Sequence, residues 1–330
     1  MTSRELCQRA IEFRKPERLP MAYPSCGHTD ILPVMYTAPK NWKPSEPGED
    51  EWGAVWQKTE IQNMGQMKKH ALSDWDALET YRFPDPDDES RYERIETMLE
   101  AVSDKYVVCL AETVLTLWER YYSLRGFGQA LMDFHLYPDK MHDLLERILE
   151  FHIGIMRNLG RRFKGRLDCF VVSDDWGTQY STLIAVPMWR AFFKERYRRL
   201  TNAIHEAGMH AILHTDGRVN DLMHDFIEVG FDGFNLHSPT VVGIEEIGQF
   251  AGKTAFMPCI DIQNTYARGT PEDVRREAKL LLEHWGTKDG GIIPLEYDRI
   301  VVGAPMENVV AAFEAFREFG MERCGAAHER

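Results

Sequence analysis

Side chains that can bind metals or transfer protons recur directly after short apolar segments of this sequence. The segments YVVCLAE, DCFVVSD, HAILHTD and GGIIPLE each end in a carboxylate, and GFDGFNL and TAFMPCI lead to a histidine and a cysteine. The residues concerned are Glu112, Asp174, Asp175, His214, Asp216, His237, Cys259, Asp261, Glu296 and Asp298. When successive strands deliver such residues to one edge of a fold, that edge is the expected place of an active site.

The motif His214-Thr-Asp216 carries the most specific chemistry. Residues i and i+2 of an extended segment point to the same side, so His214 and Asp216 can converge on one ion or one substrate. A histidine with carboxylates and one further ligand suits zinc with an open position for substrate. The other ligands would come from Glu296, Asp298 or Cys259, between which the sequence does not choose. The alternative is a His–Asp hydrogen bond that only fixes a loop.

Asp174 and Asp175, in the segment SDDWGTQ, form a second motif. Adjacent carboxylates repel each other unless they are protonated, hydrogen-bonded or bound to a cation, and this cost is typical of functional sites. One of the two would orient a substrate or donate a proton, with Trp176 and Gln179 as substrate contacts. The structural alternative is that one Asp points outward and the other inward, where it caps the loop.

The remaining candidates also have structural alternatives. Glu112 could pair with Arg120 or Arg125, and His237 could cap a helix or face solvent. Cys259 taken alone is the type of residue that fills a core as a small apolar side chain. A single Asp at a strand end often caps the next helix. The case for function therefore depends on the convergence of the whole set.

Such convergence requires parallel strands, and the apolar segments fit them. The segments are apolar almost throughout, as expected for strands buried on both faces, and helical patterns lie between them. They cover residues 19–25, 106–112, 168–174, 210–216, 230–236, 254–260 and 290–296. No nucleotide-type glycine loop follows the first segment. The pattern therefore predicts a single α/β domain over residues 1–330, a (β/α)8 TIM-like barrel with one strand not legible, rather than an open doubly wound sheet.

Residues 27–105 interrupt this alternation. The segment is rich in Pro, Trp and acidic residues, and it is too long for an ordinary connection. We interpret it as a lid inserted after the first strand, with a small hairpin around Glu51–Lys58, that covers the C-terminal mouth of the barrel. Its Trp52 and Trp56 would wall a pocket for an aromatic substrate.

The composition is that of a soluble, cytoplasmic protein. Lys plus Arg number 39 against 52 Asp plus Glu, a formal charge of −13, which disfavours nucleic acid and anionic membranes as partners. The first residues do not resemble a signal peptide, and no stretch has the apolar length of a membrane span. The six cysteines include no CxxC pair, as expected for reduced thiols. The sequence leaves an oligomer open.

Several segments spread over the chain match, in order, the pattern of one enzyme superfamily. They are SRELCQRAIEFRKPERLP, DEWGAVW, ERYYSLRGFGQALMDFHLYPD, SDDWGTQ, HEAGMHAILHTDGRVNDL, DIQNTYARGTPEDVRREA and GAPMENVVAAFEAF. With them, the chain resembles the uroporphyrinogen decarboxylase and corrinoid methyltransferase superfamily. The resemblance covers nearly the whole chain and implies a (β/α)8 barrel with its cleft at the carboxyl ends of the strands.

The resemblance is closer to the methyltransferase branch. True uroporphyrinogen decarboxylases carry Arg-Gln-Ala-Gly-Arg-Tyr after the first strand, where this chain reads PSCGH at 24–28. Methylcobamide enzymes bind zinc through His-x-Cys and a later Cys, where this chain has His214-x-Asp216 and then Glu296 or Asp298. Because the thiolates are missing, the resemblance implies an oxygen-containing substrate, as in O-demethylating methyltransferases.

The resemblance thus implies a zinc-dependent methyltransferase of the O-demethylase type. It would move a methyl group from a small methylated compound, such as a methoxylated aromatic one, to a corrinoid carried by a partner protein. His214, Asp216, Glu296 and Cys259 are the candidate metal ligands, Asp174, Asp175, Glu112 and His237 the candidate catalytic residues, and Trp176, Gln179, Trp52 and Trp56 the candidate substrate contacts. The alternatives are a decarboxylase or other lyase that acts on another carboxylic acid without corrinoid or zinc, and a barrel that binds a methylated compound without catalysis.

Overall fold

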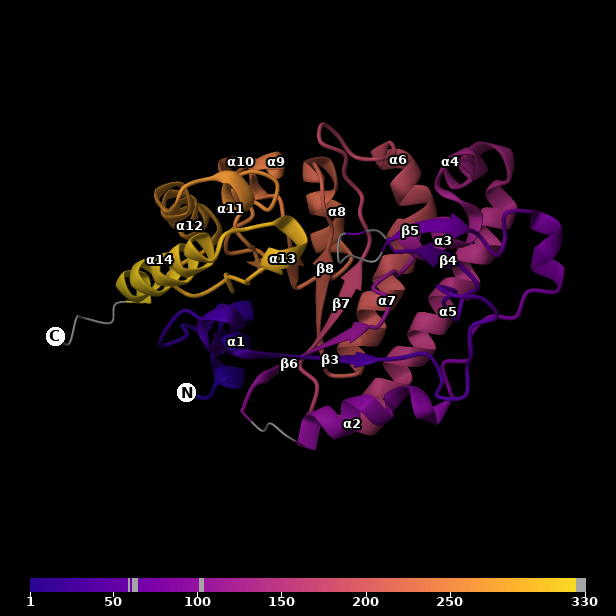
Figure 1. Cartoon of the computed structure of the whole chain (residues 1–330), viewed down its shortest axis with the longest axis horizontal. Coiled ribbons are helices and arrows are strands. Elements are labelled where there is room, and N and C mark those ends of the chain that lie inside the picture. Colours follow the sequence, from indigo (N-terminus) through magenta and orange to yellow (C-terminus); the bar gives the residue numbers. More distant parts are fainter. Residues whose placement is uncertain (59, 61–64, 101–103, 325–330) are drawn as a thin grey trace.

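The computed structural model describes residues 1–58, 60, 65–100 and 104–324, and it has a parallel sheet at its centre with helices packed around it (Figure 1). The strands are β1 (Ala22–Tyr23), β2 (His28–Thr29), β3 (Ile31–Tyr36), β4 (Val55–Gln57), β5 (Gln66–Lys69), β6 (Tyr106–Ala111), β7 (Cys169–Ser173), β8 (His210–His214), β9 (Gly233–Asn235) and β10 (Ala255–Phe256). The α-helices are α1 (Ser3–Ile11), α2 (Glu93–Glu100), α3 (Trp118–Arg125), α4 (Phe127–Leu136), α5 (Pro138–Phe163), α6 (Val186–Trp189), α7 (Glu195–Glu206), α8 (Met223–Glu228), α9 (Pro239–Val242), α10 (Ile244–Gly248), α11 (Thr265–Arg268), α12 (Pro271–Trp285), α13 (Arg299–Val302) and α14 (Met306–Cys324). Short 3-10 segments are η1 (Pro24–Cys26), η2 (Trp75–Glu79), η3 (Glu89–Tyr92) and η5 (Asn220–Leu222), and η4 (Arg190–Lys194) is π-helical. Within these residues, no helix combines the length and the apolar composition that a membrane crossing requires.

The central sheet consists of six parallel strands in the order β10, β9, β8, β7, β6 and β3. Beyond β10 the pairing continues through isolated parallel bridges, because Phe256 pairs with Ile292 and Leu295 pairs with Ala22 of β1. The sheet therefore curves round from β10 through these segments toward its own first part. Parallel strands with intervening helices and a curved edge are the features of a βα barrel.

Most of the observed strands are shorter than the apolar segments that predict them. β6, β7, β8, β9 and β10 all lie within predicted strands, whereas 19–25 forms a strand only at Ala22–Tyr23 and 290–296 contributes only isolated bridges. β3 is the strand that the sequence analysis did not identify. It pairs in parallel with β6 along its whole length, from Ile31 opposite Tyr106 to Tyr36 opposite Ala111.

The predicted lid over residues 27–105 therefore has the wrong boundary, since residues 31–36 belong to the central sheet. A small antiparallel hairpin does follow, formed by β4 and β5, and its first strand lies within the predicted 51–58. Part of the connection between the two strands, residues 59 and 61–64, lies outside the described residues. Residues 47–50 and 56–58 line a cavity together with Glu112 and Thr113, which follow β6. A lid over the whole mouth of the barrel remains a prediction.

The helices begin where the sequence supplies caps. Thr2 and Glu5 form a reciprocal capping box that starts α1, and Thr270 and Asp273 form another that starts α12. α5 begins with Pro138, which the first turn of a helix tolerates because that turn lacks backbone acceptors for its amides. The apolar side chains of these helices are buried in the hydrophobic core.

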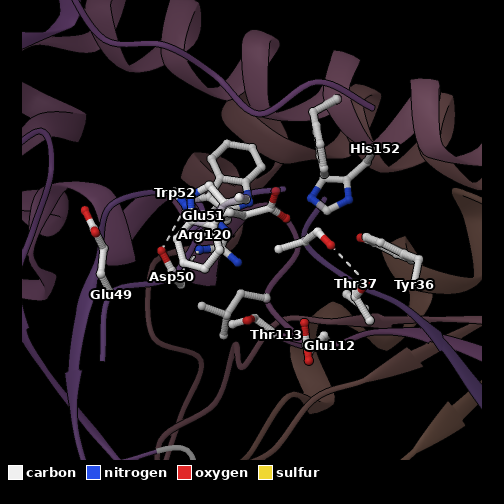
Figure 2. A pocket seen from close by; sticks show the side chains of 15 residues that line it. Tyr36, Thr37, Glu49, Asp50, Glu51, Trp52, Glu112, Thr113, Arg120 and His152 are labelled. Carbon is white, nitrogen blue, oxygen red and sulfur yellow. Dashed lines mark hydrogen bonds and ion pairs between the residues drawn. The ribbon is translucent and has the colours of Figure 1, made fainter. Parts of the chain in front are cut away.

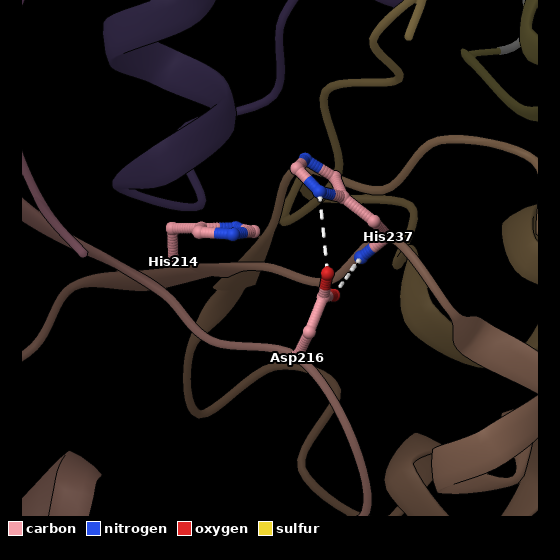
Figure 3. Close-up of side chains that lie close together, drawn as sticks. All are labelled: His214, Asp216 and His237. Atoms are coloured by element: carbon pink, nitrogen blue, oxygen red, sulfur yellow. Dashed lines mark hydrogen bonds and ion pairs between the residues drawn. The ribbon is translucent and has the colours of Figure 1, made fainter. Parts of the chain in front are cut away.

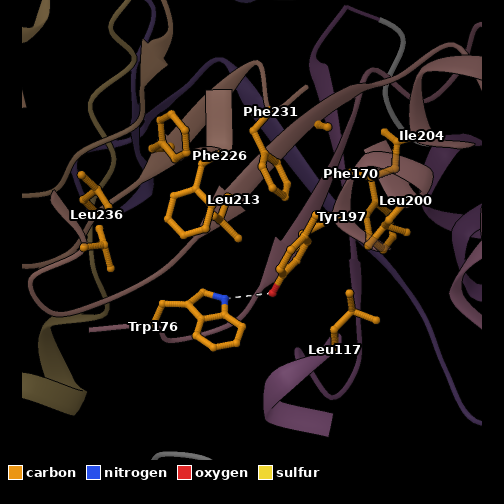
Figure 4. Packing of buried hydrophobic residues seen from close by; sticks show 14 of the residues in the cluster. Leu117, Phe170, Trp176, Tyr197, Leu200, Ile204, Leu213, Phe226, Phe231 and Leu236 are labelled. Atoms are coloured by element: carbon orange, nitrogen blue, oxygen red, sulfur yellow. Dashed lines mark hydrogen bonds between the residues drawn. The ribbon is translucent and has the colours of Figure 1, made fainter. Parts of the chain in front are cut away.

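Aromatic rings fill the core next to the carboxyl ends of the strands (Figure 4). Trp176, which follows β7, is fully buried and donates a hydrogen bond from Nε1 to the hydroxyl of Tyr197 at 2.9 Å. Its ring centroid lies 4.6 Å from that of Phe193. Phe193 belongs to the π-helical η4, and Tyr197 to the α-helix that continues from it. This packing fixes the position of the loop that follows β7.

Candidate active site

Two strand ends bring a histidine, a carboxylate and a second histidine together. His214 is the last residue of β8, Asp216 follows two residues later, and His237 follows β9. One possible ligand atom of each residue lies within 4.8 Å of those of the other two. Figure 3 shows the three side chains grouped around a common space. The approach of His214 to Asp216 is the one that their i, i+2 spacing predicts.

The orientation of His214 is fixed by Asn235 at the end of β9. Nδ1 of His214 lies 3.1 Å from both the backbone oxygen and the side-chain oxygen of Asn235. Both partners are acceptors, so Nδ1 carries the proton and donates it. Nε2 is then left with a lone pair on the side of the ring that faces the cluster, and a backbone or amide oxygen behind the ring is the usual support of a metal-binding histidine.

Asp216 and His237 form the other half of the cluster. Oδ1 of Asp216 accepts a hydrogen bond of 3.1 Å from the backbone amide of His237, and Oδ2 lies 3.6 Å from Nδ1 of its ring. Burial by itself would raise the pKa of Asp216, but the hydrogen bonding of His237 and the charges of His214 and His237 lower this pKa to about 2. Burial and the charge of His214 lower the pKa of His237. An ionised carboxylate beside a neutral imidazole is the protonation state that metal binding needs.

The two adjacent carboxylates after β7 divide into one buried and one accessible group. Asp174 is fully buried and accepts hydrogen bonds from the amides of Leu117 and Glu119, which start α3, and from the hydroxyl of Tyr197. Burial raises the pKa of Asp174 to about 7, against these hydrogen bonds. Asp174 therefore caps a helix, which is the structural alternative that the sequence analysis left open.

Asp175 is the member of this pair that reaches the cluster. Its side chain is 46% exposed, its Oδ1 accepts from the amide of Asp216 at 2.8 Å, and the same oxygen lies 3.9 Å from Nε2 of His214. Desolvation raises the pKa of Asp175; the charge of His214 lowers it, and that of Asp216 raises it further. Asp175 is thus an accessible carboxyl group directly beside the cluster.

Glu119 is a buried acid that the sequence analysis missed. Its carboxyl group accepts from the hydroxyls of Tyr122 at 3.0 Å and Ser173 at 3.2 Å. Burial and the charges of Asp175 and Asp174 raise the pKa of Glu119 well above its usual value. No sequence signal marks it, because its apolar surroundings come from other parts of the chain.

A crossing of two loops positions Asp216 and Asp175. Gly177, after β7, and Gly217, after β8, pack so closely that a Cβ on either glycine would lie 2.3 Å from a backbone atom of the other. Gly217 also has a φ of +80°, which favours glycine. The amide of Gly177 donates to the backbone oxygen of Asp216 at 3.0 Å, which locks the two loops together.

Glu296 and Cys259, the other predicted metal ligands, are not members of this cluster. Glu296 instead accepts a hydrogen bond of 3.0 Å from the amide of Ser25, in the short turn after β1. Cys259 is buried, its Sγ lies 3.7 Å from the backbone oxygen of His237, and burial raises the pKa of its thiol well above the usual value. Among the described residues, His237 takes the place that the sequence analysis gave to these two.

The remaining predicted site residues lie elsewhere. Glu112 and the tryptophans Trp52 and Trp56 line cavities beside β3 and β6. Trp176 is fully buried, so it packs the core rather than an accessible pocket wall. Gln179 is exposed in the loop after β7. Tyr297, which the sequence analysis did not single out, packs its ring edge-on at 4.8 Å from that of His237.

The family model described as uroporphyrinogen decarboxylase (URO-D) matches residues 60–319. None of the curated proteins matches the sequence significantly. Among solved structures, a methyltransferase from Methanosarcina mazei is similar at a TM-score of 0.66 and 16% identity, with 97% of this chain and 99% of that chain covered.

A second solved structure is similar to a smaller degree. A mutant of the intracellular xylanase of Thermoanaerobacterium saccharolyticum JW/SL-YS485, in complex with xylotetraose, aligns over 87% of both chains at 12% identity and a TM-score of 0.44. A TM-score below 0.5 does not establish a shared fold. The family match and the Methanosarcina structure together confirm the predicted barrel fold.

Proposed function

The chain belongs to the uroporphyrinogen decarboxylase (URO-D) family, and on this premise we propose that it is a metal-dependent methyltransferase that transfers a methyl group from a small methoxylated compound, such as an aromatic one, to a corrinoid carried by a partner protein. The observation that carries the proposal is the cluster of His214, Asp216 and His237 at the strand ends. Similarity to the Methanosarcina methyltransferase supports the fold on which this chemistry would take place.

The cluster fits a divalent metal ion such as zinc. Two imidazole nitrogens and one carboxylate oxygen are a common zinc ligand set that leaves a coordination position open for substrate. Asn235 presents Nε2 of His214, and the lowered pKa values of Asp216 and His237 keep both groups free of the protons that would compete with a metal. A zinc ion in this place would supply a Lewis acid that stabilises negative charge on the leaving oxygen.

The reaction needs a proton, which Asp175 would give. The carbon–oxygen bond of the methoxy group breaks while the methyl carbon bonds to the reduced cobalt of the partner's corrinoid, which supplies the electron pair. The leaving oxygen keeps the electron pair of the broken bond and takes a proton. Asp175 is accessible, its Oδ1 lies 3.9 Å from Nε2 of His214, and desolvation raises its pKa, so its carboxyl group is the proposed source of that proton.

The test combines metal analysis with a methyl-transfer assay. The purified protein should contain about one zinc per chain, and it should methylate cob(I)alamin from a panel of methoxylated aromatic compounds, as followed by the cobalamin spectrum. His214→Ala should lose metal and methyl transfer together, while its thermal unfolding stays close to that of the wild type because the site lies at the rim. A matched control is Glu272→Gln, an exposed acid at the start of α12, which should change neither.

A lyase is the second candidate, and the pair of Asp175 and His214 favours it. These two groups, 3.9 Å apart, could serve as acid and base in a decarboxylation without a metal. A protein that contains no zinc, and that turns over a carboxylic acid equally well after chelator treatment and without a corrinoid, would establish the lyase and contradict the methyltransferase. Ligand binding without turnover in either assay would contradict both.

A further inference from the structure

A second candidate site lies at the carboxyl ends of β3 and β6, away from the strand ends that carry the histidine cluster. It is a cavity of about 220 Å³ (Figure 2). Its walls come from the ends of these two strands, from residues 49–52 and from α5. Its lining includes Tyr36, Glu51, Trp52, Glu112, Arg120 and His152.

One buried polar atom that faces this cavity has no hydrogen-bond partner within the described part of the chain. His152 is 3% exposed, and its Nε2 donates to the backbone oxygen of Thr116 at 3.1 Å, so that Nδ1 remains as an unpaired acceptor. Tyr36 is buried, and no hydrogen bond of its hydroxyl is found among the described residues. Figure 2 shows the hydroxyl of Tyr36 and the imidazole of His152 directed into the cavity. A buried polar atom without a partner is costly, so a bound group is expected to satisfy it.

The charges that line the cavity indicate which kind of ligand fits it. Four carboxylates line it, from Glu49, Asp50, Glu51 and Glu112. Arg120 pairs with Asp50 at 3.0 Å, and the buried Arg91 forms a two-fold ion pair with Glu51. Glu49 and Glu112 have no ion-pair partner among the described residues, so the cavity carries an excess of negative charge. Burial and the charge of Arg120 lower the pKa of His152 to about 3, so its ring is a neutral acceptor and adds no positive charge.

The walls between these polar groups are aromatic. Trp52 and Phe151 pack edge-on with their ring centroids 4.9 Å apart, and Arg120 already covers the ring of Trp52 at 4.8 Å. The ligand therefore meets aromatic edges and acceptors rather than open aromatic faces. We propose that this cavity binds a small protonated amine, whose N–H groups would donate to Nδ1 of His152 and to the carboxylate of Glu112 while its carbon skeleton contacts the aromatic walls. The site is independent of the proposed methyl transfer.

The experiment measures binding of three ligands with one carbon skeleton and different charge. Benzylammonium, benzyl alcohol and benzoate are titrated by calorimetry at pH 7 into the full chain in the presence of a chelator, so that no metal at the histidine cluster can contribute. Benzylammonium should bind at least about tenfold more tightly than benzyl alcohol, and benzoate should not bind measurably. Similar binding of all three, or no binding at all because the cavity holds only water, would overturn the proposal.

Variants then assign the binding to this cavity. Glu112→Gln removes an exposed charge without changing the shape of the side chain, and it should weaken the binding of benzylammonium about fivefold or more. Tyr36→Phe should also weaken this binding and should leave the thermal unfolding of the protein unchanged. His214→Ala and Glu272→Gln, which lie outside the cavity, should bind benzylammonium like the wild type. If Glu112→Gln and Tyr36→Phe both bind like the wild type, or if His214→Ala abolishes binding, the amine binds elsewhere and the assignment is wrong.

Discussion

The imidazole of His237 lies between Asp216 and Tyr297, where a third metal ligand is needed. Replacing a ligand removes a metal–nitrogen bond, so His237→Ala should lower zinc affinity by roughly a hundredfold or more, beyond the loss typical of a supporting residue. The measurement is a zinc titration in competition with a chromophoric chelator. Methyl transfer by the same variant should fall in parallel with its zinc content.

Glu296→Gln is the matched control for this prediction. Glu296 was a ligand candidate in the sequence, but its carboxylate bonds to the amide of Ser25, and a glutamine oxygen can accept that bond equally well. The variant should bind zinc within about twofold of the wild type. A large loss of zinc in Glu296→Gln with little loss in His237→Ala would reverse the two assignments.

Glu277 offers a test of electrostatics away from the cluster. It is 5% exposed and accepts from the amide of Asp261 at 2.7 Å, and burial raises its pKa to about 7. A carboxyl group destabilises the fold when its pKa in the folded state lies above its value in the unfolded state, here near 4.5. The destabilisation is complete above pH 7 and disappears as the pH falls toward 4.5. Glu277→Gln should therefore raise the free energy of unfolding at pH 8 by about 1–3 kcal/mol and change it little at pH 5.

Urea denaturation at the two pH values measures this difference. Glu272→Gln, an exposed acid on the same helix, should show no such pH dependence. If Glu277→Gln is less stable than the wild type at pH 8, burial of the Glu277 carboxylate does not destabilise the fold.

The sequence predicted only the part of the cluster that lies at the end of a single strand, β8. His214 and Asp216 share a strand end, so their spacing alone places them together. His237 follows the neighbouring strand β9, and its distance from Asp216 depends on the register of β9 against β8, which pairs His214 with Asn235. The repeated pattern, His214-x-Asp216 on one strand and Asn235-x-His237 on the next, was a signal that the sequence contained and that the prediction did not use.

At the scale of elements, the contact between Gly177 and Gly217 ties the loop after β7 to the loop after β8. Gly217→Ala would place a Cβ 2.3 Å from the backbone of Gly177 at a φ of +80°. We expect a loss of about 3 kcal/mol in the free energy of unfolding, together with loss of zinc because Asp216 is the adjacent residue. Chemical denaturation and the zinc titration measure the two effects.

Gly208→Ala separates the close contact from the strain of the backbone. Gly208 has nearly the same φ, +83°, but nothing lies within 4 Å of its would-be Cβ. This variant should cost only about 1 kcal/mol and should keep its metal. Equal losses in the two variants would show that the crossing of the loops does not matter.

The strand β3 shows why element prediction was incomplete. Its sequence, ILPVMY, is short, contains Pro33 and begins a Pro-rich region, so it read as part of an insertion. What makes it a strand is its pairing with β6, a partner some seventy-five residues away along the chain. Strand formation depends on such partners more than on local preference. The long helices α5 and α12 lie between predicted strands, where the sequence shows helical patterns, because the spacing of apolar residues along a helix is a local property.

At the scale of the whole molecule, a buried ion pair fastens the first part of the chain to the barrel. Asp30 is 1% exposed, and its carboxylate accepts from the guanidinium of Arg18, the hydroxyl of Ser3 and the amide of Met21. These residues connect α1, the segment before β1 and the start of β3. The backbone amide of Asp30 also donates to the oxygen of Met21 at 2.9 Å, next to the bridge between Ala22 and Leu295. We therefore expect closure of the sheet to depend on this carboxylate.

Asp30→Asn should weaken the whole fold in a pH-dependent way. Burial alone would raise the pKa of Asp30, but the hydrogen bonds from Arg18, Ser3 and Met21 lower it to about 2, below the unfolded value near 3.8. Such a group stabilises the fold above pH 3.8, and the contribution is lost as the pH falls through 2. At pH 7 the variant should lose about 2 kcal/mol in the free energy of unfolding. Between pH 4 and pH 2, the wild type should lose that advantage over the variant.

The control is Asp104→Asn, because Asp104 is an exposed acid whose backbone oxygen bonds to the amide of Arg4 in the same region. Its stability should follow the wild type at every pH, so that any difference in Asp30→Asn comes from the buried carboxylate and not from the change in net charge. Because the ion pair fastens the barrel rather than one loop, the loss should appear in a single cooperative transition when tryptophan fluorescence and far-UV circular dichroism are followed together. Two separate transitions in the variant would show that the first part of the chain detaches while the remaining strands stay folded, and the barrel would then not depend on this carboxylate for its closure.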